Sequence, residues 1–215
     1  MALLFHGYAS CKSSLLLEAN ALHGLGYATF LVDFRGSGGS NGNETSVGFY
    51  EADDVAKAVE YVRQKLPPQP LILYGRSMGG AAILRAVWAN GIQADAIIIE
   101  AVFDKMLSTV QNRFAAMGLP SFPAAQLLIF WGSIPKGYPG FKHNPVAYAQ
   151  RVQCPTLMLH GAHDPRATLQ EGMAVFRSLS GPKQFEVFED AGHEAYLAAQ
   201  PEQWRHAVAH FLAQY

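Results

Sequence analysis

The sequence is poor in charged residues and has almost no cysteine. Of its 215 residues 15% are charged, the formal net charge is −1 at pH 7, and Cys11 and Cys154 are the only cysteines. A net charge so close to zero gives no strong field that would gather nucleic acid or a membrane surface, so we expect neither partner. Two cysteines without an export signal favour free thiols in a reducing cytoplasm.

Long apolar runs and metal-binding motifs are missing as well. No apolar stretch reaches the roughly 18 residues that a membrane span requires. The first residues carry no basic segment before their short apolar run, which favours a strand over a signal peptide. Neither a CxxC nor an HExxH spacing occurs, so we expect no structural or catalytic metal. Half of the residues are hydrophobic, which suits one domain of residues 1–215 with a full core.

Short apolar runs alternate with longer helical patterns along the chain. The apolar runs predict strands at 3–5, 28–32, 71–74, 96–100, 156–159 and 185–188. The helical patterns between them cover 12–25, 50–66, 78–90, 168–178 and 201–213. Runs that are apolar throughout, rather than alternating, indicate strands buried on both faces. The alternation therefore predicts an α/β fold, a parallel sheet with helices on both sides.

One segment interrupts this alternation. Residues 104–153 form a long insertion, rich in aromatic residues and methionine, between the strands at 96–100 and 156–159. Connections of this length in α/β proteins usually carry function. We interpret the insertion as a small, mostly helical cap over the functional site. A crossover helix followed by a surface loop is the alternative.

Residues 71–80, Leu-Ile-Leu-Tyr-Gly-Arg-Ser-Met-Gly-Gly, hold the strongest functional motif. The sequence G-x-S-x-G directly follows a predicted buried strand and directly precedes a predicted helix, the context that a nucleophile elbow requires. Gly75 and Gly79 leave room for the tight turn. The start of the helix favours negative charge that develops nearby. The motif predicts that Ser77 is a nucleophile.

A serine nucleophile needs a base, and the base needs an acid that orients it. In folds of this kind the chain order is Ser, then Asp or Glu, then His. Asp164 and His193 each follow a predicted strand, at the end where ligands bind in open α/β sheets. We expect Asp164 as the acid and His193 as the base. Asp104 is the rival acid, and His163 is a weak rival base beside Asp164.

The segment Leu4-Phe5-His6-Gly7-Tyr8 supplies a third element. A predicted strand ends in His-Gly, and the loop after it leads into a helix. In this architecture the oxyanion hole uses the N–H after the nucleophile and one from this loop. That assigns the backbone N–H groups of Met78 and Tyr8, with His6 bracing the loop.

Residues 33–40 are also rich in glycine. They lack the Gly-Lys-Ser/Thr ending of a phosphate-binding loop and do not lead straight into a helix. We expect a structural loop near the site, held by polar contacts of Asp33 and Arg35.

Together these motifs resemble the α/β-hydrolase superfamily, with the nearest likeness to its serine-aminopeptidase-like and lysophospholipase-like (BEM46-like) hydrolases. His-Gly-Tyr-Ala-Ser, Asp-Phe-Arg-Gly-Ser-Gly-Gly-Ser, Gly-Arg-Ser-Met-Gly-Gly, His-Gly-Ala-His-Asp and Gly-His-Glu occur in the family's order over nearly the whole chain. The resemblance implies an α/β-hydrolase fold of about six strands, in which two N-terminal strands of the family are missing. By the family's strand order, residues 28–32 are then an exposed edge, which a partner subunit or a covering segment would satisfy.

These expectations converge on a cofactor-free serine esterase that acts on a small-molecule ester through Ser77, His193 and Asp164. The aromatic residues of the insertion suit a short- to medium-chain acyl group, and Phe103, Phe114, Phe130 and Trp131 are the candidate contacts. A thioesterase or a peptidase or amidase with the same triad is the alternative. Residues 105–153 contain no Asp or Glu that would hold a substrate ammonium group, which disfavours an aminopeptidase. A non-catalytic binding protein of this fold is a further alternative.

Overall fold

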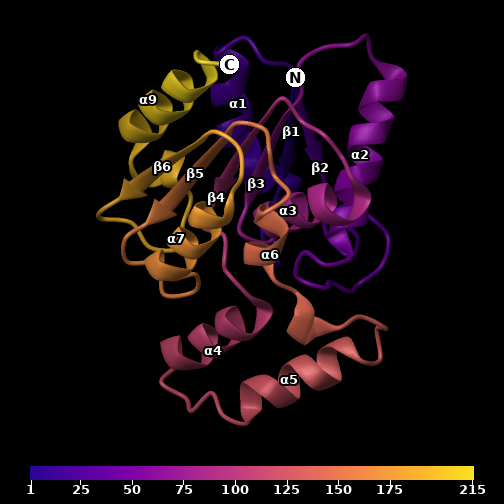
Figure 1. Ribbon diagram of the computed structural model, residues 1–215, viewed down its shortest axis with the longest axis vertical. Coiled ribbons are helices and arrows are strands. Elements are labelled where there is room, and N and C mark those ends of the chain that lie inside the picture. Colours follow the sequence, from indigo (N-terminus) through magenta and orange to yellow (C-terminus); the bar gives the residue numbers. More distant parts are fainter.

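Six parallel strands form a single sheet in the computed structural model, which describes residues 1–215 (Figure 1). Their order across the sheet is β2-β1-β3-β4-β5-β6. The strands are β1 (Ala2–Phe5), β2 (Thr29–Val32), β3 (Ile72–Arg76), β4 (Ala96–Glu100), β5 (Thr156–Gly161) and β6 (Lys183–Phe188). Every predicted strand is present, and the predicted parallel α/β sheet is confirmed.

Helices cover both faces of the sheet. Neighbouring residues of a strand point to opposite sides, so a strand that is apolar throughout has two apolar faces to bury. In β1, Leu3 and Phe5 pack into one core cluster with residues of α2 and α3, whereas Ala2 and Leu4 pack into another with residues of α1 and α9. Both clusters consist of fully buried apolar side chains, as the continuous apolar strands predicted. The helices of the body are α1 (Leu16–Gly24), α2 (Glu51–Lys65), α3 (Met78–Asn90), α7 (Leu169–Ser178), α8 (Tyr196–Ala199) and α9 (Pro201–Leu212), with a short 3-10 turn at Lys12–Leu15.

The strand β2 lies at one edge of the sheet, next to β1, as predicted for residues 28–32. All four of its residues are only partly buried. Pairing of this edge with a second subunit stays a prediction. No helix of the protein has the length and apolar character needed to cross a membrane.

Residues 104–153 contain two helices that project beyond the carboxyl ends of the strands (Figure 1). They are α4 (Met106–Ala116) and α5 (Ala124–Ser133), and they contact each other. A 3-10 turn (Gly140–Lys142) and the short α6 (Pro145–Ala149) then lead the chain back to the body, where α6 packs on α3 and α7. The insertion therefore lies at the end of the sheet where Ser77, Asp164 and His193 are found.

His143 joins the insertion to the body of the protein. Its side chain is fully buried, Nε2 donates to the Val47 carbonyl at 3.1 Å, and Nδ1 lies 3.3 Å from the Tyr148 hydroxyl. The rings of Phe49 and Phe103 lie with their centroids 5.8 Å from the imidazole. Burial lowers the pKa of His143 to about 4. The imidazole is therefore neutral at physiological pH, with its proton on Nε2.

This low pKa makes the stability of the fold depend on pH. The unfolded chain binds a proton at His143 near pH 6.5, but the folded chain does so only near pH 4, so the free energy of unfolding falls as the pH drops between these values. From pH 7 to pH 5 we expect His143 to account for a loss of about 2 kcal/mol. In His143→Gln, which keeps a donor for Val47 and does not titrate, urea unfolding at the two pH values should show a correspondingly smaller loss. An unchanged loss in the variant would contradict this role.

Candidate active site

Ser77 occupies a sharp turn between β3 and α3. Its backbone has φ 52° and ψ −111°, and its N–H donates to the Glu100 carbonyl at 2.7 Å. Only 8% of the residue is exposed. Its hydroxyl makes no hydrogen bond but is not completely buried. A non-glycine residue at positive φ is uncommon and marks functional turns. This strand–turn–helix geometry is that of a nucleophile elbow.

Glycines make this turn possible. A Cβ on Gly75 would come within 2.6 Å of the backbone of Gly79 and Gly80, and a Cβ on Gly79 would collide with the Phe5 carbonyl. The first turn of α3 therefore lies directly against the end of β1. A Cβ on Gly7 would lie 3.8 Å from that of Ser77, so the loop after β1 passes beside the serine.

Asp164 and His193 follow β5 and β6, and their side chains meet. Asp164 Oδ2 lies 2.7 Å from His193 Nδ1. The other carboxylate oxygen accepts the backbone N–H groups of Arg166 at 2.8 Å and Ala167 at 2.9 Å, which fixes the carboxylate. Asp164 is 4% exposed and His193 is partly buried, with Nε2 left without a partner. No hydrogen bond joins His193 to Ser77, and such bonds are often absent until a substrate is bound.

The rival residues lie elsewhere or are occupied. Asp104 accepts a hydrogen bond from the Ser108 hydroxyl at 2.5 Å and makes none with a histidine. His163 is exposed, while His160 is buried with Nε2 bonded to the Ala167 carbonyl at 2.8 Å. His6 accepts the Phe34 N–H on Nε2 at 3.2 Å and donates from Nδ1 to the Gly7 carbonyl at 2.8 Å. The structure therefore brings only His193 to a carboxylate.

Two free N–H groups lie at the elbow. The backbone N–H of Met78, the first residue of α3, donates to no protein group, and neither does that of Tyr8. The close approach of the Gly79 and Gly7 backbones holds both segments in place. These are the two donors that the sequence pattern proposed for an oxyanion.

A buried charged cluster lies beneath the elbow, and no sequence motif indicated it. Arg76 donates from Nε to Glu100 Oε2 at 3.1 Å and is paired with Glu18 of α1. Trp204 of α9 donates to the other Glu100 oxygen at 2.6 Å. Burial and the Glu100 charge raise the pKa of the neighbouring Tyr74. Arg76, Glu18 and Glu100 can be buried together because the arginine pairs with both carboxylates.

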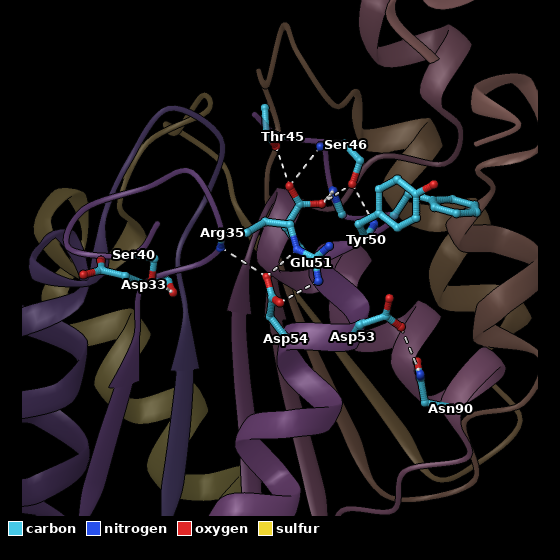
Figure 2. Close-up of polar contacts among 12 residues, drawn as sticks. Asp33, Arg35, Ser40, Thr45, Ser46, Tyr50, Glu51, Asp53, Asp54 and Asn90 are labelled. Atoms are coloured by element: carbon cyan, nitrogen blue, oxygen red, sulfur yellow. Dashed lines mark hydrogen bonds and ion pairs between the residues drawn. The ribbon is translucent and has the colours of Figure 1, made fainter. Parts of the chain in front are cut away.

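A second polar cluster holds the loop before α2 (Figure 2). Glu51 is fully buried, and each of its carboxylate oxygens accepts one backbone N–H at 2.9 Å, from Ser46 and from Gly48. The hydroxyls of Thr45 at 2.6 Å and Ser46 at 2.5 Å complete the set. Thr45 also contacts the Met78 sulfur at 3.4 Å, so Glu51 links this loop to the elbow.

The glycine-rich loop 33–40 is held by ion pairs, as predicted (Figure 2). Arg35 donates to both carboxylate oxygens of Asp54, at 2.9 and 2.7 Å. Asp33 accepts the N–H groups of Lys12 and Gly39 and pairs with the Lys12 ammonium at 2.9 Å. Although partial burial opposes it, these contacts lower the pKa of Asp33 to about 2. The charged groups of this loop are therefore paired within the protein, through Asp33 with Lys12 and through Arg35 with Asp54.

A mostly apolar cleft of about 470 Å³ lies between the insertion and the loops at Tyr8 and Val47. Its volume is within the usual range for small-molecule sites. Ser77, Asp164 and His193 do not line it, but Tyr8 does. The lining residues are Tyr8, Thr45, Val47, Met106, Thr109, Val110, Arg113, Phe114, Met117, Leu128, Ile129, Gly132, Lys136 and Tyr138.

Of the four predicted substrate contacts, only Phe114 lines this cleft. Phe103 is buried in the core against His143. Phe130 and Trp131 are 43% and 66% exposed and pack against each other, because the helical period turns Leu128, Ile129 and Gly132 of α5 toward the cleft instead. Phe103, Phe130 and Trp131 therefore do not line this cleft, and substrate contact by any of the four residues stays a prediction.

No three His, Cys, Asp or Glu side chains gather into a group that could hold a metal ion. Both cysteines are free and partly buried.

A family model and several curated proteins match most of the chain. Residues 13–215 match the prolyl oligopeptidase family (Peptidase_S9). Among curated relatives, the uncharacterized protein YqkD of Bacillus subtilis is 27% identical over 215 residues, covering 98% of this chain and 70% of that protein. Lysophosphatidylserine lipase ABHD12 of Danio rerio is 25% identical over 185 residues, covering 79% of this chain and 46% of that protein.

Solved structures share the fold at low sequence identity. The Pyrococcus furiosus esterase Pf2001 superposes with a TM-score of 0.80 at 20% identity, over 100% of this chain and 81% of its own. The monoacylglycerol lipase of Paleococcus ferrophilus gives 0.71 at 18% identity, over 99% and 93% of the two chains. These likenesses establish the α/β-hydrolase fold.

Replacement of Glu51 tests the cluster that holds the loop before α2. In Glu51→Gln the amide NH₂, in either orientation, faces the backbone N–H of Ser46 or Gly48, so a buried donor loses its acceptor. We expect the free energy of unfolding in urea to fall by about 1–3 kcal/mol. Glu60→Gln on the exposed face of the same helix is the matched control and should change it little. Equal effects of the two substitutions would contradict a structural role for Glu51.

Proposed function

Because the chain belongs to the prolyl oligopeptidase family of α/β-hydrolases, we propose that it is a serine esterase with Ser77 as its nucleophile. The observation that supports this most is the 2.7 Å contact between Asp164 and His193, formed at the same end of the sheet as the Ser77 hydroxyl, which has no hydrogen-bond partner in the protein. Asp164 uses Nδ1 of the imidazole and leaves Nε2 available as the base.

The proposed mechanism follows from these positions. Ser77 Oγ attacks the ester carbonyl while His193 Nε2 takes its proton, and Asp164 stabilises the imidazolium that results. The N–H groups of Met78 and Tyr8 stabilise the negative charge on the carbonyl oxygen. His193 then gives its proton to the leaving alcohol, which breaks the ester bond and leaves an acyl group on Ser77. Water then attacks the acyl carbonyl while His193 takes a proton from it. The bond between the acyl group and Ser77 Oγ breaks, His193 returns the proton to Oγ, and the acid is released.

The cleft favours an ester with an apolar acyl chain. Met106, Phe114 and Leu128 are among its lining residues, and Tyr8 connects it to the oxyanion donors. Methionine and phenylalanine side chains adapt well to flexible apolar ligands. Several of the matched proteins are named esterases or lipases, which accords with this substrate class.

Peptidase action is the alternative that the family name raises. An aminopeptidase would need a carboxylate for the substrate ammonium, but the charged residues that line the cleft are Arg113 and Lys136. A thioesterase would use the same groups, and thioesters of the same acyl chains are the direct comparison. A non-catalytic binding protein is disfavoured because the serine, the histidine and the carboxylate that the chemistry needs are all present, and Asp164 contacts His193.

A series of p-nitrophenyl esters tests this function. Each additional buried methylene contributes up to about 0.8 kcal/mol, or roughly a fourfold gain in kcat/KM. We expect kcat/KM to rise from acetyl through butyryl to hexanoyl esters, and we expect no release of arylamine from aminoacyl-arylamides. Ser77→Ala should abolish turnover of every ester. A clear preference for acetyl esters, or activity that survives Ser77→Ala, would contradict the proposal.

A further inference from the structure

Arg113 of α4 lines the cleft and has no carboxylate or hydrogen-bond partner in the protein. Its guanidinium lies over the ring of Tyr8, 5.0 Å from the ring centroid, and makes no hydrogen bond and no ion pair. The residue is only partly exposed. Burial lowers its pKa, and no carboxylate acts to raise it. A half-buried arginine without a counter-ion does not stabilise the fold through an ion pair, but its guanidinium is well suited to bind an anion.

Arg166 is a second cation, and its backbone lies against α4. Its N–H donates to Asp164, and its carbonyl accepts the Thr109 hydroxyl and the Asn112 amide of α4, each at 3.2 Å. These bonds fix the backbone of Arg166 against the helix that carries Arg113. The side chain of Arg166 is exposed and unpaired, and its charge contributes to the lowered pKa of Arg113.

The carboxylates of this region are engaged elsewhere. Asp164 holds His193, Asp104 accepts from Ser108, and Glu171 accepts from Asn112 at 2.8 Å. Burial raises the pKa of Glu171 to about 7, so it is only about half ionised at neutral pH. Residues 105–153 contain no Asp or Glu. The protein therefore supplies no counter-ion for the pair.

We propose that Arg113 and Arg166 bind an oxyanion on the leaving-group side of the substrate, a carboxylate or a phosphate. The inference rests on the proposed esterase function and specifies its substrate class, an ester with an apolar acyl chain and an anionic alcohol. Arg166 lies two residues from Asp164, the partner of His193, and His193 is the group that protonates the leaving alcohol. The apolar lining at Phe114 and Leu128 then remains for the acyl chain. Guanidinium groups suit both anions because each presents two parallel donors.

Two matched pairs of esters measure this preference. In the phosphate arm, 1-hexanoylglycerol 3-phosphate is compared with 1-hexanoylglycerol. In the carboxylate arm, 4-(hexanoyloxy)benzoate is compared with its methyl ester. For the wild-type protein we expect kcat/KM for the anionic member to exceed that for the neutral one by roughly 10- to 100-fold in at least one arm, the range for a charge-assisted hydrogen bond. The arm with the larger ratio identifies the anion.

Charge-removing variants assign the preference to the pair. Arg113→Gln and Arg166→Gln should each lower the anionic-to-neutral ratio, and the double variant should bring it near one. Lys142→Gln, which removes an exposed charge from the same insertion, is the matched control and should leave the ratio unchanged. A wild-type ratio near one in both arms, or a ratio that neither arginine substitution lowers, would overturn the anion subsite.

A binding measurement separates this subsite from the proposed catalysis. Calorimetry with Ser77→Ala and 1-hexanoylglycerol 3-phosphate or 4-(hexanoyloxy)benzoate should show binding that weakens roughly 10-fold or more when Arg113→Gln is added. Arginine-dependent binding without turnover of any ester by the wild-type protein would support the subsite and contradict the esterase function. Turnover of neutral and anionic esters at equal rates would do the reverse.

Discussion

At Ser77 the chain passes from β3 into α3 within one residue. The backbone there has φ 52°, which is unfavourable for a residue that carries a Cβ. Backbone conformations of this kind cost on the order of 1–3 kcal/mol and persist only where the surroundings impose them. Here the Ser77 N–H is bonded to the Glu100 carbonyl, and glycines at positions 75 and 79 let β1, β3 and α3 approach closely. The same close approach leaves the N–H groups of Met78 and Tyr8 free beside the serine. The strained turn therefore sets the geometry of every group around it.

The polar clusters on either side of this turn show how the fold supports it. Arg76, one residue before Ser77, is tied through Glu100 and Glu18 to a neighbouring strand and to α1. On the other side, Glu51 fixes the loop that contacts Met78 and lines the cleft. Removing one partner from such a buried cluster leaves an uncompensated charge or donor, which destabilises a protein far more than loss of a surface pair. These clusters therefore act as rigid supports for the turn that carries Ser77.

The sequence predicted the sheet because most of its strands are apolar runs, and it proposed Ser77, Asp164 and His193 as catalytic residues because each follows a predicted strand. It did not predict the pairing of Arg76 with Glu18 and Glu100, since partners 58 and 24 residues apart leave no local pattern. Phe130 and Trp131 lie outside the cleft for a related reason. Their aromatic character suggested substrate contact, but the rotation of α5 is set by packing against α4, which composition does not show. Local sequence context indicated the candidate catalytic residues, whereas tertiary packing decided which residues line the cleft.

Covalent labelling is the most direct test of Ser77 as the nucleophile. A fluorophosphonate reacts with an activated serine, which displaces fluoride and stays bonded to phosphorus. Mass spectrometry of the treated protein should show a single adduct on the peptide that contains Ser77, and none in Ser77→Ala. Asp164→Asn, which disturbs the orientation of His193, should slow the labelling by orders of magnitude. An adduct on another residue, or no adduct on folded wild-type protein, would contradict the assignment.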